Sequence, residues 1–480
     1  MTATLAPTPN VLATRYASPA LRAIWHPVNK ARAERRFWVT VLKAQRDAGV
    51  GFGDDDPAEV IAAYEAHLDD IDMKSIEARE RVTHHDVKAR LEEFDALAGY
   101  EHAHKGMTSR DLTENVEQAQ VLASLGLMRF KAVAALARLA ELALRYSDQP
   151  LTARTHNVPA QVTTLGKRFA SAADELATAV ARLDDLIDRY PLRGVVGPVG
   201  TAQDMFDLLG GDEAKLDDLE ARLASQLEFR SRCTSTGQVY PRSLDFDVVS
   251  ACAQLGAPAS SLALTIRLMA GFDLAGEGFD AGQVGSSAMP HKMNARSCER
   301  INGFMVLLRG YSAMTSELAG AQWSEGDVSC SVVRRVALPD TFYCLDGLLE
   351  TTLTVLAGFV AFPPAIDAEL RHQLPFLATT KVLMAAVKKG VGRETAHEAI
   401  RRHAVAAATA RHEGRDVDLV AELAGDKTLQ LSRVELDELI ADQGSMTGAA
   451  HSQVTAVVRR VAAIVATDPS TARYTPGSIL

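Results

Sequence analysis

The stretch LATAVARLDDLI, from Leu176 to Ile187, decides the class of fold. Its large apolar residues return every three or four positions, at Leu176, Val180, Leu183 and Ile187, and charged residues fall between them. This spacing places the apolar side chains on one face of an α-helix and the charges on the other. The stretch is therefore predicted to be an amphipathic helix.

The same rhythm extends through the middle of the 480-residue chain. It recurs from Val133 to Ala143 and from Ile301 to Tyr311, whereas alternating strand patterns between turn pairs are scarce. The chain is therefore predicted to be mainly α, with long helices in its centre. The apolar faces of these helices are more extensive than one thin bundle would cover, which favours self-association.

Breaks in the helical pattern predict three domains. A glycine-containing stretch at 99–106 precedes the helical run that starts near Asp111, and two prolines at 363–364 stop a helix. The expected domains are an N-terminal helical domain at 1–110, a central domain of long helices at 111–362 and a C-terminal helical domain at 363–480.

The composition is that of a globular protein without a surplus of positive charge. The chain has 51 Lys and Arg against 61 Asp and Glu, and 47% of its residues are hydrophobic. Such a balance lacks the basic footprint that nucleic acid or an anionic membrane attracts. The five cysteines include no C-x-x-C pair and the first residues contain no secretory signal, so a cytoplasmic protein is expected.

One stretch could be mistaken for a membrane span. Residues 248–266 carry no charge, but Gln254, Pro258 and several hydroxyl residues interrupt their apolar character. A helix buried in protein is the better interpretation.

A different kind of sequence, GSSAMPHKMNARSCER, runs from Gly285 to Arg300. Pro290 keeps its first part out of a helix, and the helical pattern resumes near Ser297, so a loop near 282–296 is predicted to lead into a helix. Loops on rigid scaffolds are where reactive groups concentrate.

The chemistry of this loop centres on its serines. A serine hydroxyl is a poor base unless backbone N–H groups and a cation stabilise its alkoxide. Gly285, Ser287 and Lys292 could supply both. Taken alone, these residues also suit an ordinary polar surface loop.

The stretch resembles the signature loop of the fumarase/aspartase superfamily, G-S-S-x-M-P-x-K-x-N. Further motifs resemble the adenylosuccinate lyase family in particular and follow in that family's order along nearly the whole chain. They are Arg15-Tyr16, His85-Asp86-Val87, HKGMTSRD at 104–111, ARTHNVPAQVTTLGKR at 153–168, STGQVYPR at 235–242 and VVRR at 332–335.

This resemblance implies a three-domain fold with a long central helical bundle. It also implies a homotetramer whose core is packed helices and whose active sites are shared between subunits. The implied reaction removes a proton beside a carboxylate and releases fumarate from succinylated purine nucleotides, adenylosuccinate and its aminoimidazole carboxamide counterpart. Neither a metal nor an organic cofactor is implied, and neither nucleic acid nor membrane is an expected partner.

The resemblance also assigns the catalytic roles. Ser286 is expected to be the general base, and Lys292 and Asn294 to hold the succinyl carboxylates. His156 matches the general acid, and Glu299 matches the carboxylate that orients it; without the resemblance Glu299 would be a solvated charge in the first turn of a helix.

The resemblance also places His85 among the catalytic residues, near the phosphate and the leaving group; without the resemblance His85 would belong to a polar turn after a helix. Arg334 is expected to be a surface cation. The other positions expected to bind substrate are Arg15, Tyr16, Asp86, Thr108, Ser109, Thr155, Gln238, Ser287, Met289, Asn294, Arg300, Ser331 and Arg335.

Two departures from the family pattern stand out. Asn294 is followed by Ala295 where many relatives have proline, and Glu325-Gly326-Asp327 follows Trp323 where many have an arginine that binds phosphate. Phosphate binding is then expected to rest on Arg15, Arg300 or Arg335. Alternatives are another fumarate-releasing lyase of the superfamily, such as argininosuccinate lyase, or a non-catalytic structural homologue.

Overall fold

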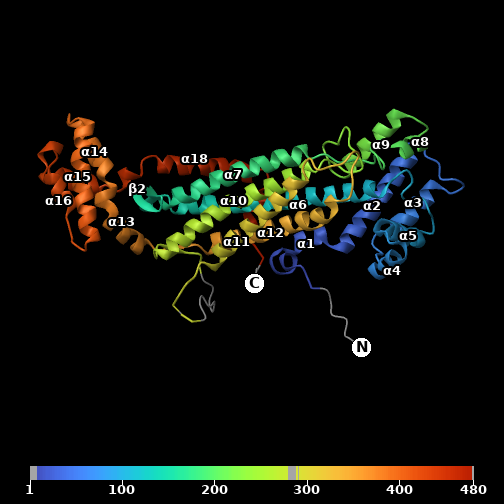
Figure 1. The fold of residues 1–480 in the computed structure, drawn as a ribbon, viewed down its shortest axis with the longest axis horizontal. Coiled ribbons are helices and arrows are strands. Elements are labelled where there is room, and N and C mark those ends of the chain that lie inside the picture. The colour runs from blue at the N-terminus through green and yellow to red at the C-terminus, as the bar shows by residue number, and fades with distance from the viewer. Residues whose placement is uncertain (1–7, 279–287, 290, 478–480) are drawn as a thin grey trace.

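A computed structural model describes residues 8–278, 288–289 and 291–477 of the chain. In it, a long bundle of helices carries a smaller helical part at each end (Figure 1). The fold is mainly α, as predicted. Ser286 and Ser287 lie outside the described residues.

The central bundle contains the helices that the apolar periodicity predicts. Its members are α6 (Ser109–Arg145), α7 (Leu165–Arg189), α10 (Ser243–Gly271), α11 (Arg296–Leu318) and α12 (Cys330–Gly358).

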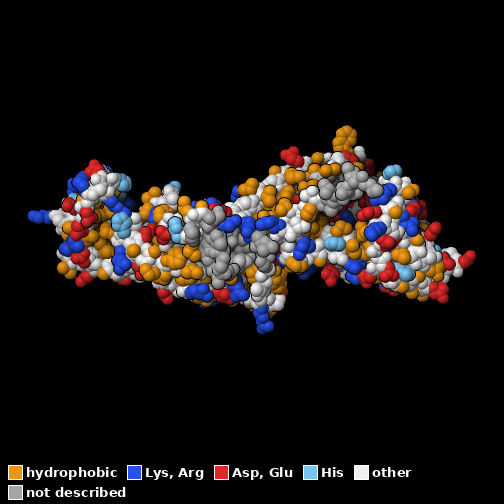
Figure 2. All heavy atoms as spheres, turned by 90° about the horizontal axis from the view of Figure 1, so that it is seen from below, with side chains coloured by type: hydrophobic (Ala, Val, Ile, Leu, Met, Phe, Trp, Pro, Cys, Tyr) orange, Lys and Arg blue, Asp and Glu red, His pale blue; other side chains and the backbone are white. Residues whose placement is uncertain are grey.

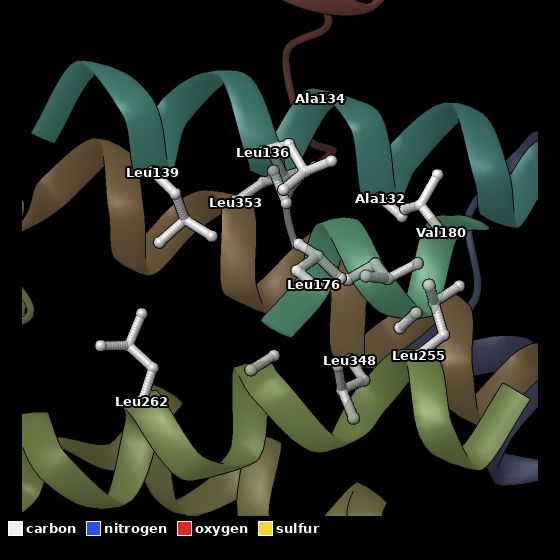
Figure 3. Packing of buried hydrophobic residues seen from close by; sticks show 14 of the residues in the cluster. Ala132, Ala134, Leu136, Leu139, Leu176, Val180, Leu255, Leu262, Leu348 and Leu353 are labelled. Atoms are coloured by element: carbon white, nitrogen blue, oxygen red, sulfur yellow. The ribbon is translucent and has the colours of Figure 1, made fainter. Parts of the chain in front are cut away.

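Leucine, valine and alanine side chains from these helices interdigitate, as the close-up of Leu136, Leu176, Leu255 and Leu348 shows (Figure 3). Burial of each large aliphatic side chain contributes roughly 1.5–3 kcal/mol. The packed helices of the bundle therefore hold the connecting loops in position.

A second hydrophobic core lies at the end of the bundle where α6 begins. Buried residues of its early helices pack with Met205, Leu219 and Leu223, which come from much later in the chain. The helices here are α2 (Pro27–Asp47), α3 (Pro57–Ala66), α5 (Asp86–Ala98), α8 (Gln203–Leu208) and α9 (Glu213–Gln226), and α4 (Met73–Thr83) packs beside α5. The short η1 (Leu12–Tyr16) and α1 (Pro19–Trp25) come before them, and Leu12 and Leu21 belong to the central core.

A third core lies at the opposite end of the molecule (Figure 1). It is built from α14 (Thr379–Lys388), α15 (Arg393–His412), α16 (Leu419–Gly425) and α17 (Arg433–Ala441), with the short η2 (Lys427–Leu429). Beside it, α13 (Pro363–Leu377) and η3 (Gly444–Thr447) form a smaller cluster with Val162. The chain then returns along the bundle as α18 (Ala450–Val465) and η4 (Pro469–Arg473), and Val454 and Val461 join the central core. The hydrophobic clusters thus cross the limits of the predicted ranges 1–110 and 363–480, and the three-domain division stays a prediction.

Strands are few in the described chain. β1 (Pro150–Thr155) and β2 (Val158–Thr164) form an antiparallel hairpin, and β3 (Ala275–Gly276) pairs with β4 (Val360–Ala361). The helical periodicity did not predict the hairpin.

Two helices, α6 and α10, are long and apolar enough to span a membrane by length and composition alone. Half or more of the most apolar part of each is buried inside the molecule. A core helix of a bundle meets the same criterion, and α10 contains residues 248–266, for which the sequence predicts a helix buried in protein.

Candidate active site

A pocket of about 380 Å³ opens where α6 begins. Elements from five separate regions of the sequence line it, because α2, the start of α5, the start of α6, the 235–242 loop and the start of α12 meet there. It brings together the predicted residues His85, Asp86, Thr108, Ser109, Gln238, Ser331 and Arg335.

His85 is held at the start of α5 by its own backbone and ring. Its Nδ1 accepts a hydrogen bond from the Lys88 backbone N–H at 3.2 Å, so His85 is the N-cap of the helix. A neutral ring that accepts at Nδ1 carries its proton on Nε2. Nε2 lies 3.2 Å from the Ser109 hydroxyl, so the ring can donate a hydrogen bond to a group in the pocket.

Asp86 is the anionic member of the predicted set. Burial would raise the pKa of this carboxyl, but the charge of Arg90, the Val87 N–H and Arg335 outweigh burial, and the pKa lies below its usual value. Arg335 is 4.0 Å from Asp86, and its side chain is 73% exposed. Its guanidinium is therefore positioned to meet an anionic ligand.

Thr108 and Ser109 are placed by the first turn of α6. Thr108 is the N-cap in a capping box with Asp111, whose carboxylate accepts the Thr108 N–H at 2.7 Å. Ser109 is the first residue of α6, and its hydroxyl lies within hydrogen-bonding distance of His85.

The same carboxylate fixes the opposite wall of the pocket. Asp111 forms a buried ion pair with Arg193 at 2.6 Å, and Arg193 donates to the carbonyls of Gly197 and Gly237. Since Gly237 precedes Gln238, one buried pair sets the relative positions of Ser109 and Gln238.

Arg334 is not the surface cation that the sequence predicts. Only 3% of its side chain is exposed, and it forms ion pairs with Glu114, Glu117 and Asp245. Successive residues of a helix point about 100° apart, so α12 directs Arg334 into the protein and Arg335 outward.

A second cation, Lys30, lies 3.1 Å from Glu117 in the pocket wall. Burial would raise the pKa of Glu117, but Lys30 and Arg334 hold it at about 2. Glu117 therefore stays ionised, and the cations around it are partly neutralised.

Arg15, Tyr16 and Arg300 form a second group, beside the middle of the bundle. The guanidinium carbons of Arg15 and Arg300 lie 5.9 and 6.0 Å from the centre of the Tyr16 ring, and Phe304 meets the ring edge-on. Gly347 on α12 lets Tyr16 approach closely, because a Cβ there would lie 3.0 Å from the Tyr16 Cβ.

Thr155 and His156 lie at the tip of the β1–β2 hairpin, and both are exposed. His156 and Asn157 form its two-residue turn with φ angles of 52° and 61°, a left-handed backbone that His and Asn adopt more readily than most non-glycine residues. The hairpin follows the far end of α6, whose 37 residues span about 55 Å. Within one chain, His156 and His85 are therefore at opposite ends of the bundle.

The last group of predicted site residues lies just before α11 and in its first turn. Glu277 caps this helix by accepting the N–H groups of Ser297 and Cys298 at 3.0 and 2.9 Å. Met289, Lys292 and Asn294 come just before it. Glu299 forms an ion pair with Arg267 at 3.8 Å in this chain, and its predicted contact with His156 stays a prediction.

Comparison with known proteins gives the family. A model of the family described as Lyase matches residues 18–310, and one described as adenylosuccinate lyase C-terminus matches residues 375–457. Adenylosuccinate lyase of Saccharomyces cerevisiae is 32% identical over 455 residues, covering 94% of this chain and 93% of the yeast protein. This chain belongs to the adenylosuccinate lyase family.

Further members agree over similar lengths. Adenylosuccinate lyase of Schizosaccharomyces pombe is 32% identical over 453 residues and covers 94% of this chain and 93% of its own. Among solved structures, a 3-carboxy-cis,cis-muconate lactonizing enzyme from Pseudomonas putida has a TM-score of 0.80 at 20% identity, with 95% of this chain and all of that chain covered. At that identity the likeness shows the fold alone.

Sequence reasoning from the family motifs missed some of the pocket lining. Lys30, Arg110 and Glu117 also face the cavity. Arg110 directly follows the matched Thr108-Ser109 pair, so its position was a usable signal. Lys30 and Glu117 are single charges on helices, and only the packing of α2 against α6 shows that they reach the site.

Among the described residues, no group of three or more His, Cys, Asp or Glu side chains is arranged to hold a metal ion. All five cysteines of this family member are free thiols, and four of them are buried.

Proposed function

We propose that this chain removes fumarate from adenylosuccinate, giving AMP, and from the succinylated aminoimidazole carboxamide ribotide, giving the free carboxamide. The observation that carries the proposal is its similarity to adenylosuccinate lyases along nearly the full length of both chains. The match to the family's C-terminal model supports the same substrate class.

The reaction is a β-elimination. The base takes a proton from the succinyl carbon beside a carboxylate, and the electron pair forms the new double bond of fumarate. The C–N bond breaks, and the leaving nitrogen takes a proton from the acid. We assign the base to Ser286, the acid to His156, and the stabilisation of the carboxylates to Lys292 and Asn294.

The pocket at the start of α6 suits the polar parts of this substrate. Ser109 and Gln238 present neutral hydrogen-bonding groups, and Arg335 presents an exposed cation. We assign His85, Asp86, Thr108, Ser109, Gln238, Ser331 and Arg335 to this part of the site. Arg15, Tyr16 and Arg300 would bind the phosphate and ribose.

The complete site would need several copies of the chain, arranged as a homotetramer. The separation of His156 from His85 along α6 supports this, because one small substrate cannot reach both within one chain. Apolar side chains also remain exposed on the bundle helices, including Leu264, Val306 and Val332, and hydrophobic side chains are visible over the face in Figure 2. A second copy would cover them.

A cytoplasmic location is part of the proposal. The free thiols of all five cysteines suit a reducing compartment.

The test is a direct assay of the purified chain with adenylosuccinate, argininosuccinate and malate. Absorbance would follow loss of adenylosuccinate, and chromatography would identify AMP and fumarate. Turnover of adenylosuccinate alone is expected, and prior treatment with a chelator should leave the rate unchanged. Faster turnover of argininosuccinate or malate, or no turnover of any of the three, would overturn the proposal.

A further inference from the structure

A charged cluster is buried in the centre of the bundle, away from the pocket at the start of α6. Lys131 on α6 forms ion pairs with Asp346 and Glu350, one turn apart on α12, and the Lys131–Glu350 distance is 2.6 Å. The three side chains are at most 1% exposed. We call them the buried charge cluster.

The buried charge cluster holds the segment that follows Arg15 and Tyr16. The Ser18 backbone N–H donates to Asp346 at 2.6 Å, and the Lys131 ammonium donates to the Ser18 hydroxyl at 3.0 Å. Tyr16 lies against Gly347, the residue after Asp346. The Arg15–Tyr16 segment is therefore fixed by contacts that lead directly to Asp346 and Lys131.

The same cluster also holds the 474–477 segment. The Tyr474 hydroxyl donates a hydrogen bond to Glu350, and the Gly477 N–H donates to the other carboxylate oxygen at 2.6 Å. The Tyr474 ring packs edge-on against Phe130 and lies 5.6 Å from the Lys131 ammonium. Burial and the Glu350 carboxylate raise the pKa of Tyr474, so its hydroxyl remains a donor.

The charges in this cluster are unequal. One ammonium faces two carboxylates: it donates hydrogen bonds to Asp346 and to the Ser18 hydroxyl, and it forms an ion pair with Glu350 at 2.6 Å. Glu350 therefore depends on Tyr474 and Gly477 for its remaining hydrogen bonds. A buried carboxylate that loses one hydrogen-bond donor competes more strongly for the remaining donors around it. Here the donor available is Lys131, which would be drawn away from Ser18.

We propose that the Tyr474 hydroxyl is a positioning group that holds the Arg15–Tyr16 segment in place through the buried charge cluster. It would thereby set the affinity for the phosphate-bearing end of the substrate. This inference rests on the proposed function, in which Arg15 and Tyr16 bind phosphate and ribose. Tyr474 itself does not touch the reacting atoms.

The first test is Tyr474→Phe, which keeps the ring and removes only the donor. The inhibition constant for AMP and the KM for adenylosuccinate are expected to rise about five- to tenfold, because a hydrogen bond to a buried charge is lost. The inhibition constant for fumarate, which lacks the phosphate, and kcat should stay within twofold. A general loss of structure would change all four quantities, so equal changes in AMP and fumarate binding would overturn the proposal.

The second test is the double variant Tyr474→Phe/Glu350→Gln. Glutamine can still accept from Gly477, but it carries no charge to draw Lys131 away from Ser18. The double variant should therefore regain most of the AMP affinity that Tyr474→Phe loses, whereas additive losses would contradict the coupling.

The control is Arg460→Gln. It removes an exposed ion pair between α18 and Asp174 at 2.6 Å and leaves the buried charge cluster intact. AMP affinity should be unchanged in this variant. AMP binding measured by calorimetry separates the two hypotheses: if the wild-type chain binds AMP but does not cleave adenylosuccinate, the proposed function fails, whereas unchanged AMP affinity in Tyr474→Phe removes only the positioning role.

Discussion

Arg334 and Arg335 are neighbours in the sequence with different environments, and substitution of each should have a different effect. Arg334 pairs with Glu114 and Asp245, both fully buried. Arg334→Met should lower the free energy of unfolding by about 3 kcal/mol, because it leaves buried carboxylates without their partner. Urea unfolding at one fixed protein concentration measures this.

Arg335→Met is the matched comparison. Its side chain is 73% exposed and meets Asp86 only at 4.0 Å, so the free energy of unfolding should change by less than about 0.5 kcal/mol. The KM for adenylosuccinate should instead rise about tenfold, since a phosphate or carboxylate contact is lost. Similar stability losses in the two variants would contradict the different environments of Arg334 and Arg335.

Gly326 lies where the family resemblance leads us to expect an arginine, and the structure explains why introducing that residue should fail. Gly326 has a φ of 125°, and a Cβ there would lie 2.9 Å from the Val239 side chain. Gly326→Arg would also disturb the Glu325 carbonyl, which accepts the Gln238 N–H at 2.6 Å. We therefore expect kcat/KM to fall, together with about 1–2 kcal/mol of stability.

Glu325→Arg is the control for added charge. It puts an arginine at the neighbouring exposed position, which is not among the residues with positive φ. Steady-state kinetics should show a KM for adenylosuccinate that is unchanged or lower, with stability retained. Improved kcat/KM in Gly326→Arg would show that this loop accepts the usual arginine after all.

At the scale of elements, the contact of α9 with the 194–197 loop should make stability depend on pH. Glu220 on α9 accepts the Val195 N–H at 2.7 Å, and burial raises the pKa of this carboxyl to about 7. An unfolded glutamate has a pKa near 4.3. Between about pH 4.3 and 7 the folded chain holds the proton more tightly, so this group makes stability fall as pH rises through that window.

Glu220→Gln keeps the acceptor for Val195 and removes the titration. Its free energy of unfolding relative to wild type should therefore increase between pH 5 and pH 8, by on the order of 2 kcal/mol. Urea unfolding of both proteins at each pH and at one protein concentration gives this difference. If the free energies of unfolding of the two proteins change with pH in parallel, then ionisation of Glu220 does not destabilise the folded state.

Much of the element scale could be predicted from the sequence. The apolar periodicity from Leu176 to Ile187 lies within α7, and the prolines at 363–364 begin α13, because these signals are local. The β1–β2 hairpin was missed, since its turn consists of His156 and Asn157 rather than a glycine pair. The burial of Arg334 was also missed, because it depends on carboxylates that are distant in sequence.

Only some residues of the candidate site could be predicted from the sequence. Motif resemblance selected residues such as His85, Ser109 and Gln238, which the fold brings to one pocket. It did not select Lys30, which reaches that pocket only through the packing of α2 against α6. Nor does the sequence show that Tyr474 and Ser18 meet at one cluster, since nothing local marks either residue.

At the scale of the whole molecule, the length of α6 determines how a site can be completed. The two ends of α6, one leading to the pocket with His85 and the other to the hairpin with His156, are about 55 Å apart in one chain. If His156 and His85 serve one substrate, as we propose, a single subunit cannot supply both, and a neighbour in a symmetric oligomer has to supply one of them. Sedimentation velocity is expected to show a tetramer.

Mixing two inactive variants tests this sharing directly. Ser286→Ala and His156→Ala should each lower turnover at least about 100-fold, as expected for a lost base or acid. If base and acid at one site come from different subunits, random mixed tetramers regain sites in which both are intact. Each position is intact in half of the subunits, so about a quarter of wild-type activity should return.

The mixed tetramers would be made by coexpression with two different affinity tags and purified through both. Each variant passed alone through the same procedure is the control, and it should stay inactive. If doubly tagged tetramers form but remain as inactive as either variant, then Ser286 and His156 act from one subunit. In that case His85 would lie at a different site from His156, and the acid and base of one site would come from the same subunit.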